Sequence, residues 1–295
     1  MRRLDQEHTT HPLARNITRR RLLQAAGLTA AGVAVYSCEY ARHAIEHVAL
    51  PVSIRNLPPA FHGFRIVQIS DIHFEAYTEP FFLNRIIREV NALSADLVLI
   101  TGDFITHGPP RSTPEKAIYV IAETLKDLTC PQRIGCMGNH DSVVGAEFVA
   151  GILRDHGTPI LINQYLPIER NGDRIWIGGV EDPASSRPNL SLAMPRNPDG
   201  PVILMAHAPD YADNVVRHPD GHKVDLILSG HSHGGQIRLP VLGPLVLPPM
   251  GRKYVEGYFQ FGPLQLYVNR GLGAVGVPFR FNCPPEITTI TLHPA

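Results

Sequence analysis

Residues 64–73 read FRIVQISDIH. The first part, 65–70, is rich in isoleucine and valine and predicts a buried strand. Asp71 and His73 follow directly, and a carboxylate and an imidazole that leave one strand end two residues apart can bind one cation together. Because ligands of open α/β sheets collect at the carboxyl ends of strands, this stretch predicts a sheet with a metal site at that edge.

The same pattern of short apolar runs recurs along the chain. Buried strands are predicted at 65–70, 97–101, 133–137, 175–178, 202–206 and 226–229, with further strands in the tail at 257–261, 264–269 and 287–292. Helices are predicted at 81–93, 114–128, 146–156 and 209–216. Alternation of strands and helices is typical of a layered α/β domain. We find no internal repeat and no linker long enough to divide this domain.

Residues that can bind metal follow the other predicted strands as well. They are GD at 102–103, GNHD at 138–141, His207 and GHSH at 230–233. The glycines keep these turns tight and let the backbone come close to a bound ion. A single aspartate or histidine at a strand end is a weak signal. The whole series, in this order and each at a strand end, is a strong indication of a metal centre.

The composition limits the classes of function. The chain of 295 residues has 27 Lys and Arg against 27 Asp and Glu, and this zero formal charge argues against specific nucleic-acid binding by bulk electrostatics. An apolar content of 44% indicates a globular core, and four cysteines exclude a disulfide-built scaffold. The 15 histidines agree with metal chemistry.

The first 46 residues are predicted to be an export and anchor segment, 1–46, that precedes a working domain at 47–295. A basic start is followed by residues 22–35, which carry no charge and are shorter than the ~20 residues that span a bilayer. Residues 18–24, TRRRLLQ, resemble the bacterial twin-arginine export motif. The alternative is an amphipathic first helix, which the few polar residues of 22–35 disfavour.

This segment predicts an exported protein, periplasmic or otherwise extracytoplasmic, with the twin-arginine export machinery as a partner. No A-x-A cleavage site follows the apolar run convincingly. A retained membrane anchor, a lipidated Cys38 and a free soluble product all remain open.

Together the motifs resemble the calcineurin-like metallophosphoesterase superfamily over roughly residues 47–292. Within it, 64–73 and the tail segments RGLG at 270–273 and PPEI at 284–287 are similar to exported bacterial phosphoesterases with a twin-arginine signal. The resemblance implies a four-layer αββα sandwich with two metal ions at the strand ends. The metal ligands that it implies are Asp71, His73, Asp103, Asn139, His207, His231 and His233.

Of these residues, the resemblance assigns Asp71, His73 and His233 to one ion and the bridge to Asp103. The remaining three complete the second site, and His140 is implied as the acid for the leaving group. Two divalent ions ~3.5–4 Å apart can hold a phosphoryl oxygen and lower the pKa of a bridging water. Mixed oxygen and nitrogen ligands suit Mn, Fe or Zn. We therefore expect hydrolysis of a phosphodiester or phosphomonoester.

Departures from related patterns bear on the substrate. Phosphoprotein phosphatases of the superfamily have one arginine shortly after the bridging aspartate and another directly before the GNH motif. Here residues 102–108 read GDFITHG and Met137 precedes Gly138, so both arginines are missing. Arg270 and Arg280 are candidate replacements, although an arginine is more often a surface charge. The loop 239–250, LPVLGPLVLPPM, contains four prolines and no regular helix. It either lines an entrance for lipid or contacts a membrane, or it packs on the sheet.

Two other classes of function compete with a phosphoesterase. The first is a non-catalytic envelope protein that binds metal or lipid on the same fold, which the complete set of predicted ligands disfavours. The second is a metal-dependent nuclease, which the near-neutral charge disfavours because a groove for a nucleic-acid backbone needs a basic surface. Some relatives cleave nucleotide-linked acyl sugars, so a lipid-linked substrate is expected by resemblance alone.

Overall fold

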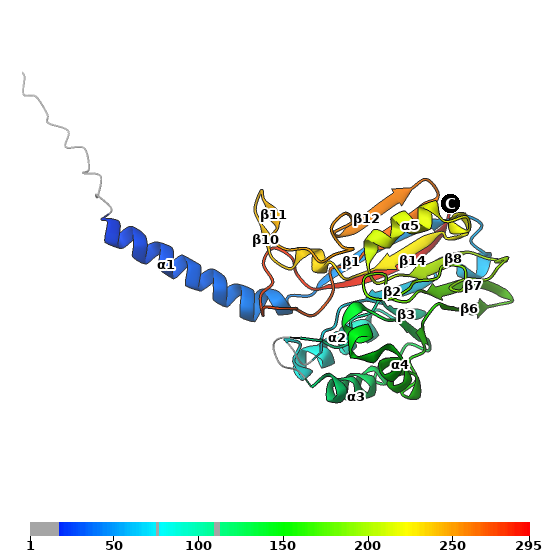
Figure 1. The fold of residues 1–295 in the computed structure, drawn as a ribbon, viewed down its shortest axis with the longest axis horizontal. Helices are drawn as coiled ribbons and strands as arrows, with labels where there is room; N and C mark the ends of the chain where they lie inside the picture. The colour runs from blue at the N-terminus through cyan, green and yellow to red at the C-terminus, as the bar shows by residue number, and fades with distance from the viewer. Residues whose placement is uncertain (1–17, 75–76, 109–112) are drawn as a thin grey trace, which may run out of the picture.

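Two six-stranded sheets form the centre of the protein in a computed structural model, which describes residues 18–295 except 75–76 and 109–112 (Figure 1). Residues 1–17, the basic start of the predicted export segment, lie outside the described residues. The strand order of the first sheet is β1 (Glu46–Ile54), β14 (Glu286–Pro294), β2 (Arg65–Ile69), β3 (Leu97–Ile100), β4 (Arg133–Cys136) and β5 (Ile160–Leu161). Only β14 and β2 pair antiparallel in this sheet.

The second sheet is parallel at its centre and antiparallel at both edges. Its strand order is β12 (Gly257–Phe261), β13 (Leu264–Val268), β9 (Leu226–Ser229), β8 (Val202–Met205), β7 (Asp173–Gly179) and β6 (Gln164–Arg170). The pairs β12–β13 and β6–β7 are the antiparallel ones. The strands β3 and β4 of one sheet and β8 and β9 of the other therefore have parallel neighbours on both sides, and β2 is parallel to β3.

Helices cover the outer faces of both sheets. The helices α2 (Pro80–Ala92), α3 (Pro114–Leu125) and α4 (Asn139–Asp155) pack on the first sheet, and α5 (Ala212–Arg217) packs on the second. In β2, Val67 faces the helices, whereas Ile66 faces the space between the sheets. Strands covered on both faces need apolar residues at every position, which explains the continuous apolar runs. The predicted four-layer αββα sandwich is confirmed.

Some element bounds differ from those predicted. The helix predicted at 146–156 begins at Asn139 in the structure, because a first turn precedes Gly145, whose φ of 137° interrupts the helical backbone. β1 was not predicted, since it is an edge strand with mostly outward, partly exposed residues and contains Pro51. It pairs with β14 along its whole length.

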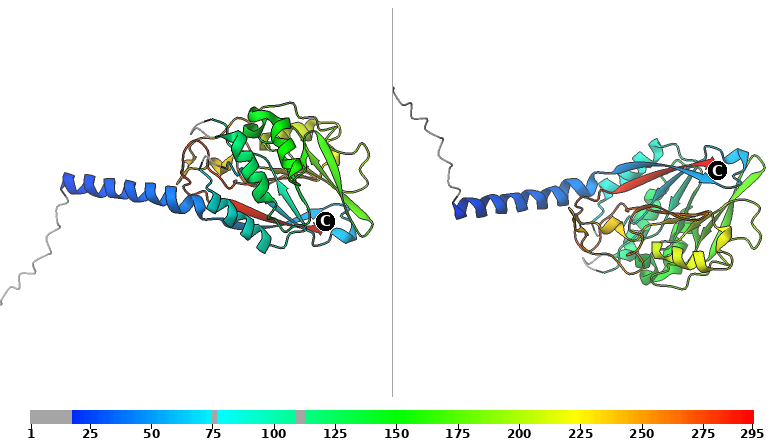
Figure 2. Two further views of the ribbon diagram at one scale, coloured as in Figure 1. Left: turned by 90° about the horizontal axis from the view of Figure 1, so that it is seen from below. Right: turned by 90° about the horizontal axis from the view of Figure 1, so that it is seen from above.

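The helix α1 (Arg19–Val35) projects from one end of the sandwich (Figures 1 and 2). The Thr18 hydroxyl caps it by accepting a hydrogen bond from the Arg21 N–H, and none of its residues is buried. Its base is held by Arg42, which donates hydrogen bonds to the carbonyls of Cys38 and Tyr77 and to the Glu79 carboxylate. Within the described residues, no helix combines the length and the apolar character that crossing a bilayer requires.

The loop 239–250 leaves the sandwich as a short hairpin of β10 (Arg238–Leu239) and β11 (Gly243–Pro244). The tip of this hairpin does not pack on the sheet, because Val241 and Leu242 are exposed. The hairpin lies at the end of the protein from which α1 projects (Figures 1 and 2).

Candidate metal centre

All seven predicted ligands meet at one edge of the sandwich. Each follows a central strand: β2, β3 and β4 supply those of the first sheet, and β8 and β9 supply those of the second. The two sheets lie face to face, so the carboxyl ends of these strands deliver their side chains to the same place. The residues brought together in this way are Asp71, His73, Asp103, Asn139, His207, His231 and His233.

Six of these seven side chains form groups with ligand atoms within 4.8 Å of one another. One group contains Asp71, His73 and His233, and another contains Asp103, His207 and His231. A third group joins His73 and Asp103 to His140. The sequence did not predict that His140 lies at ligand distance. The assignment of individual residues to metal ions stays a prediction.

Short distances between ring nitrogens and carboxylate oxygens define the first group. The Nε2 atoms of His73 and His233 are 3.0 Å apart. The Nε2 of His233 is 3.3 Å from Oδ1 of Asp71, and the Nε2 of His73 is 3.4 Å from Oδ2 of Asp103. Two imidazole nitrogens and two carboxylates thus face a common point.

Hydrogen bonds to backbone carbonyls fix the histidines of the second group. His207 donates from Nδ1 to the Thr101 carbonyl at 2.6 Å, so its Nε2 faces Asp103, at 3.1 Å from Oδ2. His231 donates from Nε2 to the Pro249 carbonyl at 2.7 Å, which leaves the lone pair of Nδ1 free. Such outer hydrogen bonds fix the tautomer and the ring orientation of a metal-binding histidine.

Five of the predicted ligands have a left-handed backbone. Their φ angles lie between 46° and 68°, at Asp71, His73, Asp103, His231 and His233. This region is unfavourable for residues other than glycine and costs of order 1–3 kcal/mol each, so surrounding structure must hold it. Such conformations gather at functional sites, and here they turn the side chains sharply inward from the strand ends.

Burial controls the pKa values of the cluster. Burial raises the pKa of Asp71 to about 6 and lowers the pKa of His73 to about 3 and that of His231 to about 4. Burial alone would also lower the pKa of His207, but the carboxylates of Asp103 and Asp71 raise it well above its usual value. The buried carboxylates therefore favour a positive charge between them.

The residues present fit two divalent ions. Among the described residues, four buried side-chain atoms have no well-directed hydrogen-bond partner, and two of them, Oδ1 of Asn139 and Nε2 of His207, belong to this cluster. Buried polar atoms are almost always satisfied, so an acceptor left open in a cluster of carboxylates and imidazoles indicates a ligand that accepts its lone pair. Oxygen and nitrogen donors of this kind suit a transition-metal ion.

Asp141, for which no role was predicted, organises the turn after β4. Its Oδ2 accepts the Gly138 N–H at 3.0 Å, and its Oδ1 accepts the N–H groups of Phe104 and Ile105 at 3.0 and 3.3 Å. Asp141 thus ties the turn after β4 to the turn after β3. Burial, together with the charge of Asp103, raises the pKa of this carboxyl to about 7. The sequence does contain a signal for this role, because a carboxylate three residues after the residue that precedes a helix often binds the backbone at the helix start.

His140, the predicted acid, lies against the cluster with its ring held from one side. Its ring Nδ1 accepts a hydrogen bond from the backbone N–H of His107 at 2.9 Å. The backbone N–H of His140 donates to Oδ1 of Asp103 at 2.9 Å. Its ring packs edge to face on His73, with centroids 4.8 Å apart. His107, whose role the sequence did not define, contributes through its backbone.

The close approach of Gly138 to Asp103 gives a first prediction. A Cβ at position 138 would lie 2.1 Å from Oδ1 of Asp103, so Gly138→Ala should displace the carboxylate and lower the metal content of the purified protein. Gly151→Ala is the matched control, because a Cβ there meets nothing within 4 Å and alanine favours the helix. Elemental analysis alongside thermal unfolding separates metal loss from unfolding. Unchanged metal content in Gly138→Ala would contradict this close-packed turn.

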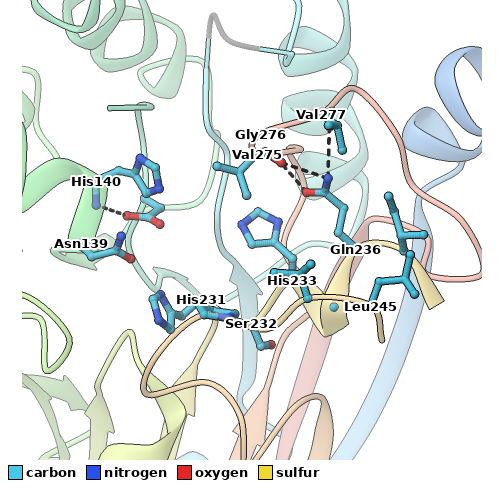
Figure 3. Close-up of a pocket in the computed structure, with 15 residues that line it drawn as sticks. Asn139, His140, His231, Ser232, His233, Gln236, Leu245, Val275, Gly276 and Val277 are labelled. Carbon is cyan, nitrogen blue, oxygen red and sulfur yellow. Dashed lines mark hydrogen bonds between the residues drawn. The ribbon is translucent and has the colours of Figure 1, made fainter. Parts of the chain in front are cut away.

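A cavity of about 480 Å³ opens beside the candidate ligands (Figure 3). One wall is polar and includes Asp103, Asn139, His140, His231 and His233. The opposite wall is apolar and consists of Ile237, Leu245, Val246, Pro248, Val275 and Val277. No arginine or lysine lines the cavity among the residues that the structure describes.

The two arginines considered as phosphate contacts bind other groups of the protein and do not line the cavity. Arg270 pairs with Glu286 at 2.5 Å and with Glu46 at 2.9 Å. Arg280 is fully buried, and its guanidinium donates to backbone carbonyls, among them that of Gly273 at 2.6 Å. The guanidinium also lies 3.4 Å from Nδ1 of His233 and does not line the cavity. The sequence could not reveal this because it does not show burial.

Comparison with known proteins agrees with the geometry. The family model described as calcineurin-like phosphoesterase matches residues 64–235. The chain is 35% identical over 274 residues to the uncharacterized metallophosphoesterase YkuE of Bacillus subtilis, covering 92% of this chain and 93% of that protein. It is 29% identical to the phosphodiesterase YaeI of Escherichia coli, covering 94% and 99%, and 31% identical to the UDP-2,3-diacylglucosamine pyrophosphatase LpxG of Chlamydia trachomatis, covering 79% and 85%.

The match covers the strands from β2 to β9 and all seven candidate ligands. Proteins of this family depend on two metal ions, and the candidate ligand groups agree with that. The chain belongs to the calcineurin-like phosphoesterases and is a phosphoric ester hydrolase.

Proposed function

We propose that the protein uses two divalent transition-metal ions, Mn, Fe or Zn, to hydrolyse a phosphodiester or phosphomonoester bond of a lipid-linked substrate at the cell envelope. The observation that carries this proposal is the cavity, which has the candidate metal ligands on one wall and apolar side chains on the other. A phosphoryl group fits the first wall and an acyl or alkyl chain fits the second.

The chemistry follows from the positions of the side chains. When bound, the two ions supply Lewis-acid stabilisation of the phosphoryl oxygens and activate the attacking water. His140 accepts a hydrogen bond at Nδ1, so its neutral ring carries the proton on Nε2, and the ring lines the cavity. This proton is available to the leaving oxygen. Asn139 offers a neutral oxygen ligand, and Asp141 holds the turn that places both residues.

The apolar wall supports a substrate with a lipid chain. Since no basic side chain lines the cavity within the described residues, the competing nuclease has no groove for a charged backbone there. One relative at 31% identity is named for a diacylated substrate, which also supports a lipid-linked substrate here. The lipid part of the substrate would contact Ile237, Val246 and Val277.

The test compares nitrophenyl alkyl phosphodiesters that differ only in the length of the alkyl chain. Each buried methylene contributes about 0.8 kcal/mol, so kcat/KM should rise roughly four-fold per methylene until the wall is covered. Val277→Ser should reduce this gain and leave the methyl ester nearly unaffected. A kcat/KM that does not depend on chain length would exclude the lipid-linked substrate and leave the phosphoesterase activity itself intact.

The same proposal includes export. We infer that residues 1–46 carry the protein through the twin-arginine pathway and that α1 then retains the domain 47–295 at the outer face of the cytoplasmic membrane. The twin-arginine motif at 18–24 and the fully exposed apolar surface of α1 support this.

Export gives a second prediction. Replacing Arg19 and Arg20 by lysine should leave the protein in the cytoplasm, because the receptor reads paired guanidinium groups and not charge alone. Cell fractionation measures the outcome. Lysine at the exposed Arg88 and Arg217 is the control and should not alter delivery. Normal envelope delivery of the Arg19 and Arg20 variant would mean that another route carries the protein.

A further inference from the structure

The tip of the β10–β11 hairpin presents large apolar side chains to solvent. The exposed fractions of Val241 and Leu242 at the tip are 105% and 77%, and that of Val246, just after the hairpin, is 78%. No charged residue occurs from position 239 to position 251. Contiguous exposed apolar residues of this kind mark a surface that another phase or molecule covers.

The helix beside the hairpin indicates which phase this is. Exposed leucines and valines occupy α1 around its whole circumference, at Leu22, Leu23, Leu28, Val33 and Val35. A protein groove accepts one apolar face of an amphipathic helix, whereas lipid contacts every face. Arg19, Arg20 and Arg21 lie at the far end of α1, where phosphate headgroups would neutralise them.

Aromatic residues lie where α1 joins the domain. Tyr36 and Tyr40 are exposed and stack with ring centroids 5.4 Å apart. Tyrosine is enriched at the level of the lipid headgroups because its ring is apolar and its hydroxyl is polar. The order of basic, apolar and aromatic residues along this segment favours lipid as the occupant over a protein partner.

Hydrogen bonds connect α1, the hairpin and the cavity. The Arg280 N–H donates to the Ser37 carbonyl at the base of α1. The Tyr77 hydroxyl donates to the carbonyl of Gly276, in the loop 275–277 that lines the cavity. From the other side, Gln236 at the start of the hairpin donates to the carbonyls of Val275 and Val277 (Figure 3). The rim of the cavity therefore lies between the two apolar projections.

We propose that the hairpin tip, Val241 and Leu242, inserts into a lipid bilayer beside α1, so that the cavity opens toward the membrane surface. The insertion rests on the exposed side chains. Only the delivery of a membrane-embedded phosphoester to the metal centre rests on the proposed function. Because the tip side chains Val241 and Leu242 do not line the cavity, they can be changed without touching the catalytic wall.

Tryptophan fluorescence of the full-length protein tests the insertion. Trp176 is the one tryptophan of the chain, so wild-type protein supplies the baseline. Leu242→Trp should add emission that is mostly quenched on vesicles of phosphatidylethanolamine and phosphatidylglycerol doped with phosphatidylcholine brominated on its acyl chains. Val216→Trp is the matched control on α5, at an apolar residue that is 51% exposed, and its added emission should not be quenched.

Two results would overturn the proposal. One is unquenched Leu242→Trp emission in protein that sediments with the vesicles, which would leave the tip in water. The other is a failure of the wild-type protein to sediment with them.

A rate measurement separates this proposal from the proposed function. The double variant Val241→Ser and Leu242→Ser should lower kcat/KM on a phospholipid presented in vesicles by on the order of ten-fold or more. Its rate on a soluble nitrophenyl phosphoester should not change. Equal rates of variant and wild type on the vesicle substrate would contradict delivery from the membrane. Absence of any activity on the soluble ester would contradict the proposed function, and the quenching result would still stand.

Discussion

Replacing Asp103 with asparagine is expected to remove metal from both candidate sites and with it almost all hydrolytic activity. The Oδ2 of Asp103 lies 3.1 Å from Nε2 of His207 and 3.4 Å from Nε2 of His73, so one carboxylate faces both groups of ligands. Asparagine keeps the shape and loses the charge. Even outer hydrogen-bond partners of metal ligands contribute roughly 10- to 100-fold to affinity or activity, and a shared ligand should exceed that range.

The measurement is elemental analysis and activity on the same samples. Asp127→Asn provides the control, because it makes the same chemical change at an exposed aspartate in the turn after α3 and should retain both ions. If Asp103→Asn kept full occupancy at both sites, Asp103 would not be the bridging ligand.

Replacing His140 with alanine should have the second largest effect, and the effect should depend on the leaving group. A general acid contributes ~10²–10⁴-fold, most when the leaving group is poor. We expect a large loss of rate on alkyl or sugar phosphoesters and a smaller loss on nitrophenyl esters, with metal retained. Asn139→Ala should instead lower metal content and slow all substrates equally. His62→Ala, at an exposed histidine, should change nothing.

Two outcomes would revise the role of His140. Equal losses on both leaving groups with metal retained would make it a group that positions the phosphate. Loss of metal would make it a ligand, for which its place in a group with His73 and Asp103 offers a structural basis.

Much of the fold could be predicted because each central strand is covered on both sides. Ile66 and Val67 pack into different layers, so the strand is apolar throughout and stands out in the sequence. β1 is an edge strand that contains Pro51 and gave no such signal. The first turn of α4 was missed because Gly145 breaks the helical periodicity directly after it.

The candidate site shows the same division. Ligands at strand ends were predictable because the strands could be located, and parallel strands end together. The role of Asp141 was not, since it depends on which backbone N–H groups of another turn reach its carboxylate. The role of Arg280 could not be predicted, because its burial and the backbone carbonyls that surround its guanidinium are properties of the folded chain alone. The exposure of the hairpin tip likewise could not be predicted from the sequence.

The most direct test of the central claim is a metal titration of the wild-type protein stripped by a chelator. Activity on a nitrophenyl phosphodiester is measured as Mn, Fe or Zn is added, together with the number of ions bound per chain. We predict negligible activity without metal and full activity only when two ions are bound. Activity that persists in the metal-free protein, or that reaches its maximum with one ion per chain, would contradict a dinuclear centre.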